Sequence, residues 1–75
     1  MKRYKNLSGN SAVAAYEIGK DSVKVGFTTN SVYIYSDQSA GHPNINQMKV
    51  LALAGKGLGT FITANVKERF ARKIR

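Results

Sequence analysis

Residues 22–36 read SVKVGFTTNSVYIYS, and their pattern decides the fold. On both sides of the central Thr-Thr-Asn, apolar residues alternate with other residues at the period of two that is typical of β-strands. β-Branched and aromatic residues, which suit a pleated surface, dominate the second half. The stretch therefore predicts a β-hairpin with strands over residues 23–27 and 32–35.

A third strand is predicted upstream of this hairpin. Residues 12–18 alternate in the same way, and a four-residue loop over 19–22 would set Tyr16 opposite Val25 and Ala14 opposite Phe27. Downstream, residues 36–43 are rich in turn and strand-breaking residues, so the sheet is expected to end there. The middle of the chain thus reads as a three-stranded antiparallel meander.

The apolar period changes from 2 to 3.6 after Pro43, which indicates helices. One helical stripe contains Ile45, Met48, Leu51 and Ala52. Asn44 is the expected N-cap of this helix, and Gly55 is expected to end it. A second stripe, which follows the expected N-cap Thr60, contains Ile62, Val66, Phe70 and Ile74. The predicted fold class is α+β, a three-stranded antiparallel β-meander followed by two α-helices packed on one face.

The length of the hairpin turn decides which face of the sheet carries the tyrosines. If Thr29-Asn30 is a two-residue turn, Gly26 lies opposite Tyr33 and Lys24 opposite Tyr35, and both rings point away from the helices. The apolar face then consists of Ala12, Ala14, Tyr16, Ile18, Val23, Val25, Phe27, Val32 and Ile34. A three-residue loop would shift the pairing by one and place both tyrosines in the core. Both registers stay open, and the functional hypothesis follows the first.

Charge points to a polyanionic partner. The chain has 75 residues with twelve Lys and Arg against four Asp and Glu, a net charge of +8. Ten of the twelve bases lie in residues 1–11 and 44–75. The electric field of so many positive charges attracts phosphate backbones, anionic membranes or acidic proteins. Alternatively, the positive charge serves only to keep the protein soluble.

Length and composition describe one small domain. Residues 1–11 lack apolar periodicity and are expected to form a basic flexible N-terminal arm, while residues 12–75 form a single α+β domain. Cysteine is absent, which excludes disulfides and thiolate metal sites and favours a cytoplasmic location. We expect neither a secretory signal nor a membrane-spanning segment, because the apolar runs are too short.

The sequence contains no motif that indicates an enzyme. The single histidine, His42, stands in a Gly-His-Pro turn without a second histidine or a carboxylate cluster, so neither a metal site nor a general base is expected. The glycines of residues 55–59 match neither the phosphate-loop nor the dinucleotide-binding pattern. They could present backbone N–H groups and Lys56 to an anion, or they could simply connect two helices. We expect no catalytic residue, no metal, no cofactor and no small-molecule substrate.

Several short motifs follow one another in a recognisable order. They are Tyr16-Glu17, Val23-x-Val25-x-Phe27, Tyr33-Ile34-Tyr35, Gly59-Thr60-Phe61-Ile62, Val66-Lys67 and Phe70. In this order the chain resembles the KTSC domain, a short domain found at the C-terminus of some lysyl-tRNA synthetases and as a stand-alone bacterial protein. The chain departs from that family at Gly57-Leu58-Gly59, where Ser-x-Gly is usual, at Thr63, where Asn is common, and at Thr29-Asn30, which replaces an Asn-Gly-like turn. The resemblance implies a shared fold; RNA binding has been suggested for this family, and no catalytic role is established for it.

We therefore expect a non-enzymatic module that binds RNA or single-stranded nucleic acid. Nucleobases would stack on the two tyrosines of the Tyr-x-Tyr strand, and basic side chains would neutralise phosphates. The expected nucleic-acid-binding residues are Lys24, Tyr33, Tyr35, Lys56, Lys67, Arg69, Arg72 and Lys73. The alternative is a protein–protein interaction module, a regulator or inhibitor whose basic surface docks on an acidic partner.

Overall fold

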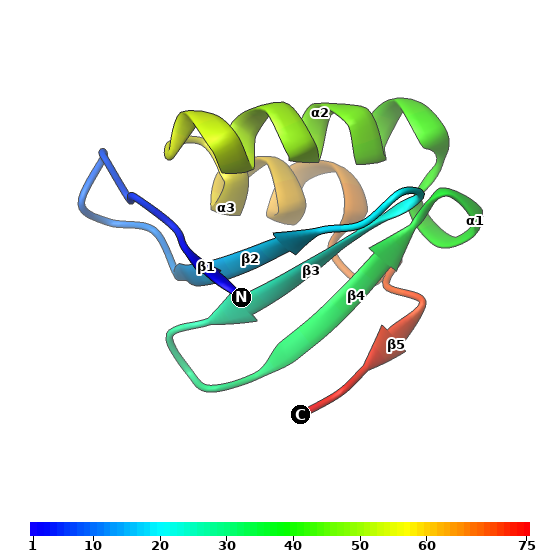
Figure 1. The fold of residues 1–75 in the computed structure, drawn as a ribbon, viewed down its shortest axis with the longest axis horizontal. Coiled ribbons are helices and arrows are strands. Elements are labelled where there is room, and N and C mark those ends of the chain that lie inside the picture. The colour runs from blue at the N-terminus through cyan, green and yellow to red at the C-terminus, as the bar shows by residue number, and fades with distance from the viewer.

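The structure, a computed structural model, describes residues 1–75. A five-stranded antiparallel sheet in the order β1-β2-β3-β4-β5 is covered by helices on one face (Figure 1). The strands are β1 (Lys2–Arg3), β2 (Val13–Ile18), β3 (Ser22–Phe27), β4 (Val32–Ser36) and β5 (Arg72–Lys73). The helices are α1 (Asp37–Ala40), α2 (His42–Ala54) and α3 (Leu58–Phe61), and α3 continues directly into the π-helix η1 (Ile62–Val66).

The α+β class is confirmed, but the sheet has five strands where three were expected. Both additional strands come from the ends of the chain. In β1, Lys2 lies opposite Tyr16, and in β5, Lys73 lies opposite Tyr33. Each of these strands has only two residues, both exposed, so neither could show an alternating apolar pattern.

Residues 1–11, expected to form a flexible arm, are packed against the domain instead. Tyr4 is a core residue with 3% of its surface exposed, and its hydroxyl accepts a hydrogen bond of 3.2 Å from the backbone N–H of Leu58. The N–H of Leu7 donates to the carbonyl oxygen of Gly55 at 2.7 Å. One aromatic side chain in a polar segment has no periodicity, which is why the sequence did not reveal this anchor.

The turn between β3 and β4 has three residues, Thr28 to Asn30. Phe27 N–H donates to the carbonyl of Ser31 at 2.8 Å, and Asn30 N–H donates to the carbonyl of Phe27 at 2.9 Å. Asn30 has a φ of 71°, in the left-handed region that Asn tolerates better than most residues. A three-residue loop with its last residue in this region is a common way to close a hairpin.

This loop overturns the register on which the functional hypothesis rested. Val25 lies opposite Tyr33 and Val23 lies opposite Tyr35, so the tyrosines share the helix-covered face with the valines. Val32 and Ile34, expected on the helix-covered face, belong to the other face, where Val32 is nevertheless buried. Because strand side chains alternate, a shift of one residue reverses every side chain of the strand.

The register between β2 and β3 agrees with the prediction over most of its length. Tyr16 lies opposite Val25, as predicted, but a β-bulge near Ala14 shifts the pairing. Val13 therefore lies opposite Phe27 and is buried, whereas Ala14 is exposed. A bulge inserts one unpaired residue, which moves the residues before it to the opposite face.

The core lies between the helix-covered face of the sheet and the helices. It consists of Tyr4, Val13, Tyr16, Val23, Val25, Tyr35, Ala40, Ile45, Met48, Ala52, Leu58, Ile62 and Val66. The buried side chains of α2 are three of the four predicted for its stripe. The helix begins earlier than predicted, after Gly41 with a φ of 96°, and Pro43 fits its first turn.

The last helix is shorter than its apolar pattern predicted. Ile62 and Val66 are buried, but the helix ends at Lys67, and the chain then returns to the sheet as β5. Phe70 packs against the tyrosines of β4, and Ile74 is 49% exposed. Phe70 and Ile74 thus continue the four-residue spacing of Ile62 and Val66 although they lie beyond the end of the helix.

Candidate nucleic-acid interface

Tyr35 is a core residue and offers no ring face to a ligand. Only 2% of its surface is exposed, and its hydroxyl donates a hydrogen bond of 3.3 Å to the backbone carbonyl of Lys67. Burial, with a smaller contribution from nearby Tyr33, raises the pKa of Tyr35 from 10.0 to about 12. The stacking platform of two exposed tyrosines on one strand is therefore absent.

Tyr33, by contrast, is half-buried and borders an open hollow beside η1 and β5. Its ring packs edge-on against Phe27, with centroids 5.6 Å apart, and against Phe70, with centroids 4.7 Å apart. We call this space, of about 770 Å³, the aromatic hollow. Its lining comprises Ala12, Phe27, Thr29, Ser31, Tyr33, Tyr35, Ile62, Thr63, Lys67, Glu68, Phe70 and Lys73.

Two of the expected basic residues line the aromatic hollow. Lys73 lies opposite Tyr33 in the sheet, and its Nζ atom is 5.7 Å from the centroid of the Tyr33 ring, within the range of a cation–π contact. Lys67, at the end of η1, is exposed, and Glu68 beside it supplies the one acidic side chain of the lining. The hollow therefore combines aromatic walls with cationic side chains.

Lys24 and Arg72 lie on the other face of the sheet. Both residues share a pairing row with Ile34, so their side chains point away from the helices and from the aromatic hollow. The ammonium of Lys24 is 3.8 Å from a carboxylate oxygen of Glu17. A ligand that occupies the aromatic hollow on the helix-covered side of the sheet therefore cannot contact Lys24 or Arg72 on that side.

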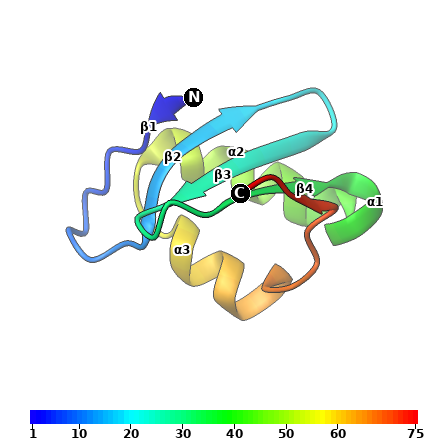
Figure 2. The ribbon, with the colours of Figure 1, turned by 90° about the horizontal axis from the view of Figure 1, so that it is seen from below.

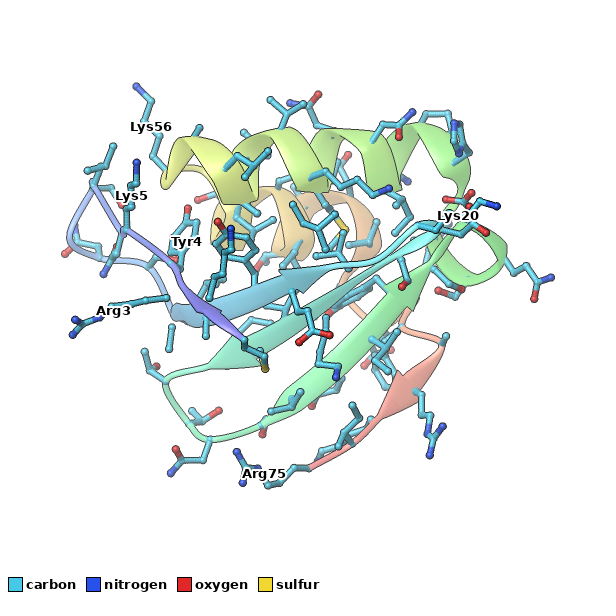
Figure 3. The ribbon with its side chains drawn as sticks, viewed as in Figure 1. Arg3, Tyr4, Lys5, Lys20, Lys56 and Arg75 are labelled. Carbon is cyan, nitrogen blue, oxygen red and sulfur yellow. The ribbon has the colours of Figure 1, made fainter.

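The remaining predicted bases are also dispersed. Lys56 lies in the loop after α2, at the same end of the molecule as Arg3 and Lys5, whereas Lys20 lies at the opposite end (Figure 3). Arg69 is exposed in the segment between η1 and β5. Of the eight expected residues, the aromatic hollow brings together Tyr33, Lys67 and Lys73, with buried Tyr35 behind them.

Phe27 and Phe70 are site residues that the sequence assigned to other roles. The apolar patterns placed both residues in the core, and each side chain is in fact only partly buried against it. Their meeting with Tyr33 depends on the register of β4 and on the return of the chain to β5. A local pattern contains neither piece of information.

His42 has more polar neighbours than its sequence context indicated. It begins α2, its Nδ1 atom is 2.9 Å from Oδ2 of Asp37, and its Nε2 atom is 3.1 Å from the amide nitrogen of Asn46. No group of three or more His, Cys, Asp or Glu is placed to hold a metal ion. The contact of His42 with Asp37 joins α1 to the start of α2, and its contact with Asn46 lies within α2.

Comparison with protein-family models, curated proteins and solved structures gives no match. No helix has both the length and the apolar character needed to cross a membrane. What can be inferred about function therefore depends on the geometry and charge of the chain itself.

Proposed function

We propose that this protein binds single-stranded nucleic acid, with one base held in the aromatic hollow and the adjoining phosphates contacted by its lysines. The observation that carries the proposal is the meeting of Tyr33, Phe27 and Phe70 with Lys67 and Lys73 in one open space. Every base has a π-face, and stacking on a protein aromatic contributes about 1 to 3 kcal/mol per base. RNA binding has also been suggested for the KTSC family, which the sequence resembles. We propose that the chain is a KTSC-like, non-enzymatic domain and that it acts in the cytoplasm.

The position of Lys73 fits an exchange of contacts on binding. Its ammonium lies near the Tyr33 ring in the free protein. A base that stacks there would replace this contact, and the long lysine side chain would then reach the phosphate next to that base. Because the net charge is +8, the field of the whole molecule favours the approach of a polyanion.

The experiment is an affinity measurement with a labelled single-stranded oligonucleotide at several salt concentrations. Each phosphate contact contributes about 0.7 to the slope of log K against log salt, so two lysines would give about −1.4 and five bases about −3.5. Tyr33→Leu removes the ring but keeps an apolar side chain, and we expect it to weaken binding about 5- to 150-fold. Circular dichroism shows whether the variant is folded.

A matched pair of charge variants separates a site from diffuse attraction. Lys67→Gln removes a positive charge at the aromatic hollow, and Lys20→Gln removes one at the β2–β3 turn, outside the lining. Binding in the hollow requires the first variant to lose more affinity than the second. Equal losses would mean that net charge alone attracts the oligonucleotide, and the proposal would then be abandoned.

A protein-binding function is the second candidate, favoured by a separate observation. Val50 and Leu53 on α2 are each 58% exposed, and Leu7 is 65% exposed. Residues three apart share a helix face, so Val50 and Leu53 form a small apolar surface on α2. If no oligonucleotide binds at low salt, we propose that an acidic protein partner uses this surface, with Lys56 near the end of the helix.

A further inference from the structure

A second hollow, of about 660 Å³, adjoins the aromatic one. The two spaces share Ala12, Phe27 and Thr63 in their linings, so they lie side by side. We call the second space the polar hollow and the two together the groove. The groove extends from β5, past the end of β3, to the loop that precedes α3.

The walls of the polar hollow are the segment that leads into β2 and the start of the last helix. Figure 2 shows this segment and α3 at the same edge of the sheet. A Cβ atom on Gly59 would lie 3.1 Å from Oγ of Ser11, so glycine at this position allows the two walls to approach closely. The lining of the polar hollow is Ser8, Asn10, Ser11, Ala12, Phe27, Gly57, Gly59, Thr60, Thr63 and Ala64.

The polar side chains of this lining have unused hydrogen-bonding capacity. Ser8, Asn10, Thr60 and Thr63 take part in none of the side-chain hydrogen bonds of the structure. Ser11 Oγ accepts a hydrogen bond from the N–H of Val13, which leaves its own O–H free to donate. The polar hollow therefore offers hydroxyl and amide groups to a ligand.

The two hollows also differ in charge. No Lys, Arg, Asp or Glu lines the polar hollow, whereas both lysines of the site lie at the aromatic hollow. A neutral surface rich in hydroxyl groups suits a sugar better than a phosphate, because a phosphate is held mainly by cations. The ribose is the part of a nucleotide that such a surface recognises.

We infer that the groove selects RNA over DNA, with a base in the aromatic hollow and the 2′-hydroxyl of a neighbouring ribose bonded in the polar hollow. The inference rests on the proposed function and adds the kind of nucleic acid to it. The 2′-hydroxyl is both a donor and an acceptor, and it is the group by which a protein distinguishes RNA from DNA at one position. One additional hydrogen bond corresponds to about a fivefold to tenfold preference.

The test compares oligouridine with oligodeoxyuridine of equal length, which differ only at the 2′ position. We expect the protein to bind oligouridine about fivefold to tenfold more tightly. The double variant Ser8→Ala, Thr60→Val adds no bulk and removes two hydroxyls from the polar hollow, both at residues outside the lining of the aromatic hollow. It should bring the affinity ratio close to one and leave the affinity for oligodeoxyuridine unchanged. Thr28→Val, which changes an exposed threonine outside both linings, is the control and should retain the ratio.

The outcomes separate this inference from the proposed function. Equal affinity of the protein for the two oligonucleotides would overturn the selection of RNA and leave single-strand binding in place. If the protein bound neither oligonucleotide, both the selection of RNA and the proposed function would be overturned. A preference for RNA that survives in the double variant would place the recognition of the 2′-hydroxyl elsewhere and overturn the role of the polar hollow.

Discussion

Replacing Tyr35 by phenylalanine tests the register that removed the tyrosine platform. Tyr35 is 2% exposed, and its hydroxyl donates a hydrogen bond of 3.3 Å to the carbonyl of Lys67. Phenylalanine keeps the ring and removes the hydroxyl. Because the bond is long, we expect the variant to lose about 0.5 to 1 kcal/mol of unfolding free energy at pH 8.

The same substitution changes how stability depends on pH. The pKa of Tyr35 is raised to about 12, mainly by burial, whereas an unfolded tyrosine titrates near 10. Below pH 10 the hydroxyl is protonated in both states, and its contribution to stability is fully present. Between pH 10 and 12 the unfolded state releases the proton while the folded state keeps it, so the folded protein loses on the order of 1 kcal/mol per pH unit.

The assay is urea unfolding followed by circular dichroism, from pH 8 to pH 11.5, on the protein and on Tyr35→Phe. All other ionisable groups are the same in the two proteins, so their effects cancel in the difference. We expect the protein to be the more stable of the two at pH 8, the difference to shrink as the pH approaches and passes 10, and its sign to reverse at about pH 10.5. A difference that stays constant over this range would place the hydroxyl in water and refute the assigned register.

The remaining predictions concern the turn, the N-terminal segment and the charges. Asn30→Ala should lower the unfolding free energy by about 1 kcal/mol, because alanine is strained at a left-handed φ, and Asn30→Gly should not; equal stabilities would argue against the three-residue loop. Tyr4→Phe leaves the buried N–H of Leu58 without its acceptor, and we expect a loss of about 1 to 3 kcal/mol in chemical denaturation, where a free arm would show none. Lys73→Gln should reduce the magnitude of the salt slope of oligonucleotide binding by about 0.7, and Lys20→Gln should leave it unchanged; a reduced slope in both would contradict contact at the hollow.

The sequence identified those parts of the fold that depend on burial. An alternating pattern reports which strand residues face a core, and a period of 3.6 does the same for a helix. Strands β2, β3 and β4 and the buried stripe of α2 were therefore predictable. The two outer strands were not, because their pairing depends on backbone hydrogen bonds between residues far apart in the chain.

The face that the tyrosines occupy could not be decided from local sequence. Neither possible turn contains glycine, so turn chemistry does not separate a two-residue loop from a three-residue one. The choice depends on what the helices must cover. With the three-residue loop the core gains the large ring of Tyr35 and gives its hydroxyl a partner at Lys67, while the smaller Val32 and Ile34 move to the other face.

The sheet also limits how many of the basic residues one ligand can contact. Lys73 and Arg72 are neighbours on the edge strand β5, yet they point to opposite faces, Lys73 toward the aromatic hollow and Arg72 toward the face of Lys24. A strand confined to the groove contacts Lys67 and Lys73 and gives a salt slope of about −1.4. A slope near −2.1 would mean that the ligand passes around the edge of β5 and reaches Arg72 as well, and a slope near −3.5 would require two further bases. If the ligand reaches Arg72, the variant Arg72→Gln will lower the magnitude of the salt slope. If the ligand stays in the groove, the same variant will leave the slope unchanged.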